Sequence, residues 1–292
     1  MKGGRQVTIQ EYHELATRLR ISTIKMTSRS GSSHVGSSLS ICDLLAVLYG
    51  GIMHVDPEKP DWPLRDRFVL SKGHACAPVY AMLAIKGFFP QEWLESYCLD
   101  GARLPGHITH FNIPGVEVST GSLGHGLPVA CGMALAGKAD EDPYRVFVLL
   151  SDGELDEGST WEGALFASHH NLDNLVAIID YNKLQACGRV ASVLGLEPLA
   201  DKLLAFGWSV NEIDGHDVEK IEQVLNSVPF TRGKPSCIIA HTVKGKGVSI
   251  MEDTVVSHYR HLDKEELQEA LRALGGRLEN SICQYVGELG HH

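Results

Sequence analysis

The sequence lacks the features of a disulfide-stabilised protein and of a nucleic-acid-binding protein. Its 292 residues include seven cysteines, an odd number, and no two of them have the CxxC spacing. Most lie in apolar surroundings, so we expect buried, reduced thiols in a cytoplasmic protein. Positive charge is also scarce, because 26 Lys and Arg oppose 36 Asp and Glu and give a net charge of −10. This balance argues against binding to nucleic acids or to anionic membranes.

Long apolar stretches are missing as well. The N-terminal segment MKGGRQVTIQEYHELATRLR is polar and has no apolar core of the kind that signal peptides contain. No uninterrupted apolar run approaches the roughly 18 residues that a membrane-spanning helix needs. We therefore expect neither a signal peptide nor a transmembrane helix.

The sequence does contain a regular alternation of short apolar segments and helical segments. The apolar segments are near-continuous, as strands are when helices cover both faces of a parallel sheet. They are RFVLS, VFVLL, LVAIID, WSVNEID and SCIIAHT. This pattern predicts an α/β fold with a doubly wound, mostly parallel sheet and helices on both faces. We expect residues 1–250 to form this domain and residues 251–292 to form a C-terminal helical extension.

Local signals indicate where helices begin and where one long loop lies. Residues 9–28 carry apolar side chains at helical spacing, and Ser40 is a candidate N-cap for the apolar helix after it. The segment PQEWLESYCL is expected to form another helix. Residues 101–121 are rich in Gly, Pro and His and predict a long loop, and loops of this length are often functional.

Polar side chains follow two of the predicted strands at the point where each strand ends. The strand VFVLL leads directly to Asp152, Glu154, Asp156 and Glu157, and Asn182 follows the strand LVAIID. Because ligands of doubly wound folds bind beyond the carboxyl ends of the strands, Asp152 and Asn182 can reach a common point. Their oxygens suit Mg²⁺ or Ca²⁺ held against a phosphate near the next helix N-terminus. The alternative is that Asp152 and Asp156 only cap that helix.

Several motifs in a fixed order resemble one protein family. The segment SDGELDEGSTWEGALFASHHNLDNLVAIIDYNKLQ resembles the thiamine diphosphate motif, which begins with GDG and ends with Asn one helix later. Further matches are SGSSHVGSSLSICDLLAVLY, DRFVLSKGHACAPVYAML, LPGHITHFNIPGVEVSTGSLGHGL and AHTVKGKGVSIMED. Together these segments extend over nearly the whole chain, which is similar to the N-terminal subunit of a split transketolase.

The resemblance implies a set of cofactor-binding residues. A Mg²⁺ ion would be bound by the side chains of Asp152 and Asn182 and by the carbonyl of Leu184, and Ca²⁺ or Mn²⁺ could replace it. Thiamine diphosphate would be contacted by a larger set of residues: His74, Gly121, Leu123, Gly153, Glu157, Asn182, Lys244 and His258. Within this set, Gly153 and Lys244 match contacts of the diphosphate.

The resemblance also implies four catalytic histidines: His34, His74, His107 and His258. A ketose donor loses a hydroxyl proton when its carbon–carbon bond breaks, and an aldehyde acceptor gains one when the new bond forms. Imidazole can move protons in both directions near neutral pH and can form hydrogen bonds with sugar hydroxyls. His110 and His125 are weaker candidates, and His216 is expected to have only an ordinary core or surface role.

The implied reaction is the transfer of a two-carbon ketol unit from a ketose to an aldehyde, with the cofactor as electron sink. Two single residues and one short segment depart from the family pattern. Ser151 replaces the first Gly of GDG, which serves the turn, Cys187 stands where many relatives carry Asp, and Ser257-His258-Tyr259-Arg260 replaces the commoner Trp-His-Gly. The last two lie near the expected donor pocket, so they count against the usual sugar phosphate substrates more than against the cofactor. The alternatives are a pyruvate-using enzyme similar to deoxyxylulose-phosphate synthases and a non-catalytic cofactor-binding scaffold subunit.

A partner subunit is implied as well. In single-chain transketolases the matched segment precedes a pyrimidine-binding domain, which carries the Glu that activates the cofactor. Because the sequence ends at residue 292, we expect a C-terminal transketolase subunit to supply that domain. The paired active sites of the family lie at a two-fold interface, which implies an α2β2 assembly.

Overall fold

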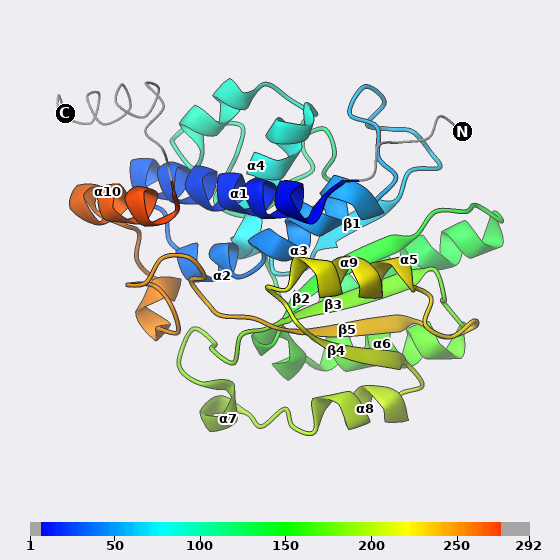
Figure 1. The fold of residues 1–292 in the computed structure, drawn as a ribbon. Helices are drawn as coiled ribbons and strands as arrows, with labels where there is room; N and C mark the ends of the chain where they lie inside the picture. The colour runs from blue at the N-terminus through cyan, green and yellow to red at the C-terminus, as the bar shows by residue number, and fades with distance from the viewer. Residues whose placement is uncertain (1–6, 276–292) are drawn as a thin grey trace.

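A five-stranded parallel sheet lies at the centre of the structure, a computed structural model that describes residues 7–275 (Figure 1). The strands are β1 (Arg67–Leu70), β2 (Val146–Ser151), β3 (Leu175–Tyr181), β4 (Ser209–Asp214) and β5 (Ser236–His241). Their order in the sheet is β1-β2-β3-β5-β4, and every neighbouring pair is parallel. Each strand coincides with one of the predicted apolar segments.

The side chains of the sheet enter two separate cores, because successive residues of a strand point to opposite faces. In β2, Phe147 and Leu149 belong to one core, whereas Val146, Val148 and Leu150 belong to the other. The first core is completed by α1 (Ile9–Ser30), α3 (Cys42–Val47), α4 (Cys76–Lys86) and α9 (Val218–Asn226). The second is completed by α5 (Gly126–Ala139), α6 (Gly158–His169) and α8 (Leu199–Ala205). Helices on both faces confirm the doubly wound fold.

Shorter helical segments connect these layers. They are α2 (Val35–Leu39), a π-helix (Leu48–Ile52), α7 (Val190–Val193) and four 3₁₀-helices (Gly73–Ala75, Gln91–Ser96, Gly153–Asp156 and Val255–His258). After them comes α10 (Lys264–Ala273), which packs against α1 in a third core that includes Ile24, Leu267 and Leu271. Residues 276–292 lie outside the described part, so the domain boundary expected near residue 250 stays a prediction.

Two of the local predictions were wrong. The N-cap of α3 is Ile41, and the hydroxyl of Ser40 instead donates a 2.7 Å hydrogen bond to the buried carboxylate of Asp180. A charge-assisted bond of this kind is stronger than a neutral cap. The segment PQEWLESYCL forms only the 3₁₀-helix Gln91–Ser96, because the chain turns at Tyr97 and buries that side chain against Cys76.

The stretch Val35–Ile52 also departs from the sequence-based expectation. By length and composition it is apolar enough to cross a membrane, although Ser and Gly interrupt its apolar residues. In the structure 89% of this stretch is buried inside the protein. A position in the core therefore accounts for its composition.

Candidate active site

Asp152 and Asn182 lie at the carboxyl ends of neighbouring strands, as predicted. Strand β2, which precedes Asp152, pairs in parallel with β3, which precedes Asn182. The carboxylate of Asp152 accepts hydrogen bonds from the backbone N–H of Gly153, at 2.8 Å, and from that of Lys183, at 2.6 Å. Because Lys183 directly follows Asn182, the two expected metal ligands belong to one hydrogen-bonded unit.

The third expected ligand, the carbonyl of Leu184, belongs to the same unit. The side-chain oxygen of Asn182 accepts a 3.0 Å hydrogen bond from the N–H of Leu184. The Leu184 carbonyl accepts one, also at 3.0 Å, from the ammonium group of Lys244. Asp152, Asn182 and Leu184 are 1%, 6% and 3% exposed. Their oxygens keep acceptor capacity beyond these bonds, so one carboxylate, one amide and one carbonyl oxygen fit a hard divalent cation.

The electrostatics of Asp152 also fit a cation. Burial raises the pKa of Asp152 to about 6, the nearby carboxylate of Asp180 acts in the same direction, and hydrogen bonds from Gly153 and Lys183 oppose both. A buried carboxylate in this state gains most from a positive charge at its free lone pairs. Within residues 7–275, no three His, Cys, Asp or Glu side chains form a metal-binding group. A cation at Asp152 therefore depends on the amide and carbonyl oxygens.

The capping alternative fails for the helix after the carboxylates. Asp152 caps only the 3₁₀-helix Gly153–Asp156, through its bond to the N–H of Gly153. The N-cap of α6 is Glu157, whose side chain makes no capping bond. Asp156 instead accepts a 2.8 Å hydrogen bond from the side chain of Gln185.

The four histidines expected to be catalytic form one cluster. The ring of His34 lies at its centre, with centroids 5.0 Å from His74, 5.7 Å from His107 and 4.8 Å from His258. His34 has a φ of 69°, which is uncommon for a residue other than glycine, and its N–H donates a 2.9 Å hydrogen bond to the carbonyl of His258. Four segments far apart in the sequence therefore meet at these rings.

Three of these imidazoles are uncharged at neutral pH. Burial lowers the pKa of His34 to about 4, and His107 and Lys244 add to this effect. Burial also lowers the pKa of His258 to about 3, with contributions from Lys244 and His34, and holds that of His74 well below its usual value. A neutral imidazole offers one hydrogen-bond donor and one acceptor. The cluster can therefore bind hydroxyl groups without repelling a cation.

Lys244 connects the histidine cluster to the expected metal ligands. Its side chain is 1% exposed, and its ammonium nitrogen lies 3.2 Å from Nδ1 of His258 as well as 3.0 Å from the Leu184 carbonyl. Burial lowers the pKa of Lys244 to about 8, so the group is mainly protonated at pH 7. A buried ammonium beside a cation site suits the anionic oxygens of a diphosphate.

A buried ion pair beneath this site was missed by the sequence analysis. Lys72 and Asp180 are both 0% exposed, and Nζ lies 2.5 Å from Oδ2. The same carboxylate accepts hydrogen bonds from the side chains of Ser40, Thr242 and Asn182. Because Nδ2 of Asn182 donates to Asp180 at 3.0 Å, the pair fixes the orientation of that amide. The signal available in the sequence was a charged residue inside an otherwise apolar strand.

Glu154 explains why further carboxylates follow β2. Its side chain is completely buried, and it accepts hydrogen bonds from the hydroxyl of Ser71 and, at 2.8 Å, from the backbone N–H of Gly124. The first donor follows β1, and the second lies in the TGSLGHG loop. Glu154 therefore ties the loop that contains Leu123 to the turn that contains Asp152.

The remaining expected residues border the site to different degrees. A Cβ atom at Gly121 would lie 3.3 Å from the ring of His107, so this glycine packs against the histidine cluster. Leu123 is half-buried, and Glu157 is exposed next to Gly124. These placements leave the cofactor contacts expected of Leu123 and Glu157 as predictions.

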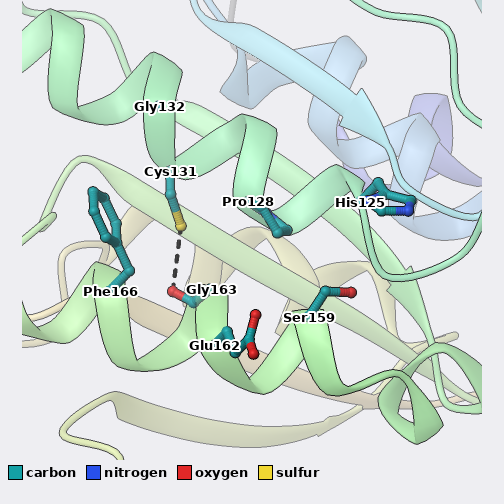
Figure 2. Close-up of a pocket in the computed structure, with 8 residues that line it drawn as sticks. All are labelled: His125, Pro128, Cys131, Gly132, Ser159, Glu162, Gly163 and Phe166. Atoms are coloured by element: carbon teal, nitrogen blue, oxygen red, sulfur yellow. Dashed lines mark hydrogen bonds between the residues drawn. The ribbon is translucent and has the colours of Figure 1, made fainter.

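Two weaker candidates lie outside the cluster. His110 is exposed and its ring bonds to the hydroxyl of Ser119 at 2.8 Å. His125 lines a separate pocket of roughly 390 Å³ between α5 and α6, together with Cys131, Glu162 and Phe166 (Figure 2). None of the four clustered histidines lines this pocket.

Comparisons with known proteins agree on one family. Residues 12–283 match the family described as transketolase, thiamine diphosphate binding domain. The chain is 43% identical over 269 residues to the 6-deoxy-6-sulfo-D-fructose transketolase subunit of Clostridium sp. (strain MSTE9), covering 92% of this chain and 97% of that protein. It is 43% identical over 274 residues to an apulose-4-phosphate transketolase subunit of Phocaeicola vulgatus, covering 94% of this chain and 96% of that protein.

A solved structure extends the comparison to the fold. The transketolase of Campylobacter jejuni matches with a TM-score of 0.88 and 31% identity, and the match covers 97% of this chain. It covers 48% of the Campylobacter chain, so this chain spans about half the length of that transketolase. The chain thus belongs to the transketolase family, as a ketol-transferring transketolase subunit that contains the thiamine diphosphate binding domain, and the family, fold class and function expected from its sequence are confirmed.

Proposed function

We propose that this chain is the diphosphate-binding subunit of a two-chain transketolase that requires Mg²⁺. One observation carries the proposal. The Leu184 carbonyl, which belongs to the same hydrogen-bonded unit as Asp152 and Asn182, accepts a bond from Lys244, and Lys244 contacts His258 of the histidine cluster. A cation site, a buried ammonium group and a set of neutral imidazoles are thus contiguous.

Each part of this arrangement has a separate task. Asp152, Asn182 and Leu184 would hold Mg²⁺, and Lys244 would contact the diphosphate. The metal ion and the ammonium group would together balance the negative charge of the diphosphate oxygens. When bound, thiamine diphosphate supplies the electron sink for breaking and forming the carbon–carbon bond. The fixed turn at Asp152 and the loop tied by Glu154 would keep the cofactor in one orientation.

The histidines would bind and deprotonate the sugars. His107 is exposed, whereas His34 and His74 are partly buried, so the cluster extends from the surface inward. A neutral imidazole can accept the hydroxyl proton of the ketose donor as its bond breaks and return a proton to the acceptor oxygen. His107 is the candidate for this transfer because it lies nearest to solvent.

The substrates we propose are ketoses and aldehydes with an anionic end. The two curated relatives are named for a sulfonated ketose and for a sugar phosphate, and both bear such a group. The arginine of the Ser257-His258-Tyr259-Arg260 segment is not free to bind this anionic end, because Arg260 forms an ion pair with Glu266 of α10.

The partner we propose is a C-terminal transketolase subunit with a pyrimidine-binding domain, in an α2β2 assembly. The Clostridium and Phocaeicola relatives, matched over 97% and 96% of their length, are named as subunits, and the chain matches 48% of a transketolase chain. Large apolar side chains on α5 and α6 are also exposed, namely Val129, Leu165 and Phe166 at 38%, 55% and 40%. An exposed apolar face of this kind is typical of a protein contact. The expected cytoplasmic location stays a prediction.

A reconstitution assay tests this function. The purified chain is assayed with thiamine diphosphate, Mg²⁺, ketose donors and an aldehyde acceptor, with and without the candidate partner subunit. We expect ketol transfer only in the mixture. A parallel assay uses pyruvate as donor and measures CO₂ release. This assay distinguishes a transketolase from the alternative enzyme that resembles deoxyxylulose-phosphate synthases. Turnover by the chain alone would exclude the need for a partner, and CO₂ release without ketol transfer would exclude the ketose donor.

A further inference from the structure

A second buried charged network contacts the loop that carries Lys244. Its centre is Asp43 of α3, which is 4% exposed. Both carboxylate oxygens accept hydrogen bonds from the guanidinium group of Arg20, and Oδ2 also lies 2.7 Å from Nδ1 of His216. Arg20 belongs to α1 and His216 to the turn after β4, so three separate elements meet at this carboxylate.

Both partners of Asp43 continue to one short loop, residues 243–247. Nε of Arg20 donates a 3.1 Å hydrogen bond to the carbonyl of Lys246. Nε2 of His216 accepts a 2.8 Å hydrogen bond from the backbone N–H of Val243. The network therefore holds the loop on both sides of Lys244.

The hydrogen bonds determine the tautomer of His216, that is, which of its two ring nitrogens carries the hydrogen. Because Nε2 accepts from a backbone N–H, the ring proton lies on Nδ1 and is donated to Asp43. His216 thus links the buried carboxylate of Asp43 to the backbone of Val243 through one hydrogen bond at each ring nitrogen. This role contrasts with the ordinary core or surface role expected from the sequence.

Stability alone does not explain such a network. A buried ion pair loses much of its attraction to desolvation, and apolar residues of similar volume stabilise a core as well or better. What the polar groups add is direction, since Asp43 orients Arg20 and His216, and each of these two side chains bonds to a specific backbone atom of the loop. The turn itself is tight, because Gly245 has a φ of 83° and a Cβ there would lie 2.2 Å from the carbonyl oxygen of Met251.

We propose that Arg20, Asp43 and His216 are positioning residues that fix the loop 243–247 and thereby place the ammonium group of Lys244 beside the diphosphate site. The inference rests on the proposed function for the role of Lys244. The side-chain hydrogen bonds described for Arg20, Asp43 and His216 join them to one another and to the loop backbone, and none of these bonds reaches an expected metal ligand or a clustered histidine. The network's effect on ligand binding passes through the loop.

Two substitutions of His216 separate positioning from simple stability. In His216→Gln, the carboxamide can replace one donor and one acceptor at a spacing close to that of the two ring nitrogens. In His216→Phe, the ring volume is kept and both hydrogen bonds are lost. A matched control is His241→Phe, because Nε2 of His241 lies 2.8 Å from the carboxylate of Glu212 near the end of the same sheet, and no hydrogen bond described for its ring reaches the loop.

Two measurements on the full chain decide the proposal. Hydrogen exchange of the ligand-free chain reports on the amides of residues 243–247, and calorimetry measures the affinity for inorganic pyrophosphate with Mg²⁺. We expect His216→Phe to speed exchange in this loop by about tenfold or more and to weaken pyrophosphate binding by roughly 10–100-fold. His216→Gln and His241→Phe should stay near wild type. If His216→Phe does not fold, Arg20→Lys carries the same comparison, because one ammonium cannot reach both Asp43 and the Lys246 carbonyl.

Unchanged exchange in the loop of His216→Phe, or an equal loss in His241→Phe, would overturn the positioning role. Faster exchange spread evenly over the chain would do so too. A wild-type chain that binds no pyrophosphate would contradict the proposed function instead, and the exchange comparison would still decide whether the network holds the loop.

Discussion

The ammonium nitrogen of Lys244 lies 3.2 Å from Nδ1 of His258, and this contact determines which ring nitrogen carries the proton. An ammonium group can only donate hydrogen bonds, so Nδ1 of His258 accepts and Nε2 bears the hydrogen. Burial and the charge of Lys244 both lower the pKa of His258, to about 3, which keeps the ring neutral. His258 therefore offers an N–H donor to whatever binds beside it.

Replacing Lys244 by methionine should change the titration of His258. The Lys244→Met variant keeps the length of the side chain and removes the positive charge that helps to lower the pKa of His258. We expect the pKa of His258 to rise and the affinity for pyrophosphate to fall. NMR titration of the histidine ring signals measures the first effect. An unchanged His258 titration would show that the two groups do not interact.

His107→Ala should reduce turnover more than cofactor affinity. The residue lies at the exposed end of the cluster, 5.7 Å from the ring of His34. Loss of a group that transfers protons typically costs about 10²–10⁴-fold in rate. Steady-state kinetics of the reconstituted enzyme give both quantities, and His110→Ala, in the same loop, is the control. A variant with full turnover and only weaker cofactor binding would assign His107 to binding instead.

Glu154→Leu should destabilise the fold around the site. The substitution leaves the N–H of Gly124 and the hydroxyl of Ser71 without their buried acceptor. A buried donor that loses its partner costs about 1–3 kcal/mol. Urea unfolding measures the free energy of unfolding, with the exposed Glu162→Gln as control. Equal stability of the two variants would show that Glu154 does not hold the loop.

The protein should lose stability as the pH falls below about 6.5. The pKa of His34 is about 4 in the folded chain and 6.5 when unperturbed, so between these values the unfolded state binds more protons. His74, His107, His258 and Lys244 face the same ring, and the lowered pKa values of His74 and His258 act in the same direction. Urea unfolding at pH 7 and pH 5 should show the loss, and His34→Gln should reduce it. A pH dependence in His34→Gln equal to that of wild type would contradict this account.

The sequence predicted the sheet and the Asp152–Asn182 pair because both depend on local patterns. Near-continuous apolar segments marked the strands, and parallel pairing of β2 with β3 necessarily brings their carboxyl ends together. The four histidines were identified by resemblance, and their contact depends on loops whose paths no periodicity reveals. The family pattern supplied what the physical pattern could not.

The missed residues are those whose roles depend on distant partners. Lys72 and Asp180 are 108 positions apart, and their ion pair becomes visible only when β1 and β3 are placed in the sheet. Ser40 was misread as a cap for the same reason, since its hydroxyl bonds to Asp180 at a separation of 140 positions. His216 looked ordinary because its partners, Asp43 and Val243, lie in other elements.

The most direct measurement of the central claim is calorimetry of thiamine diphosphate binding to the reconstituted complex, with wild type and Asp152→Ala compared in Mg²⁺ and in a chelator. We expect wild type to bind only with Mg²⁺. Loss of an outer-shell group typically weakens metal binding by roughly 10–100-fold. Because Asp152 is a direct ligand in this account, Asp152→Ala should weaken cofactor binding by more than that, while its circular dichroism stays native. Asn182→Ala should be affected less, because it loses a neutral ligand. Binding of the cofactor by Asp152→Ala with wild-type affinity, or by wild type equally well in the chelator, would contradict the metal-diphosphate site at the ends of β2 and β3.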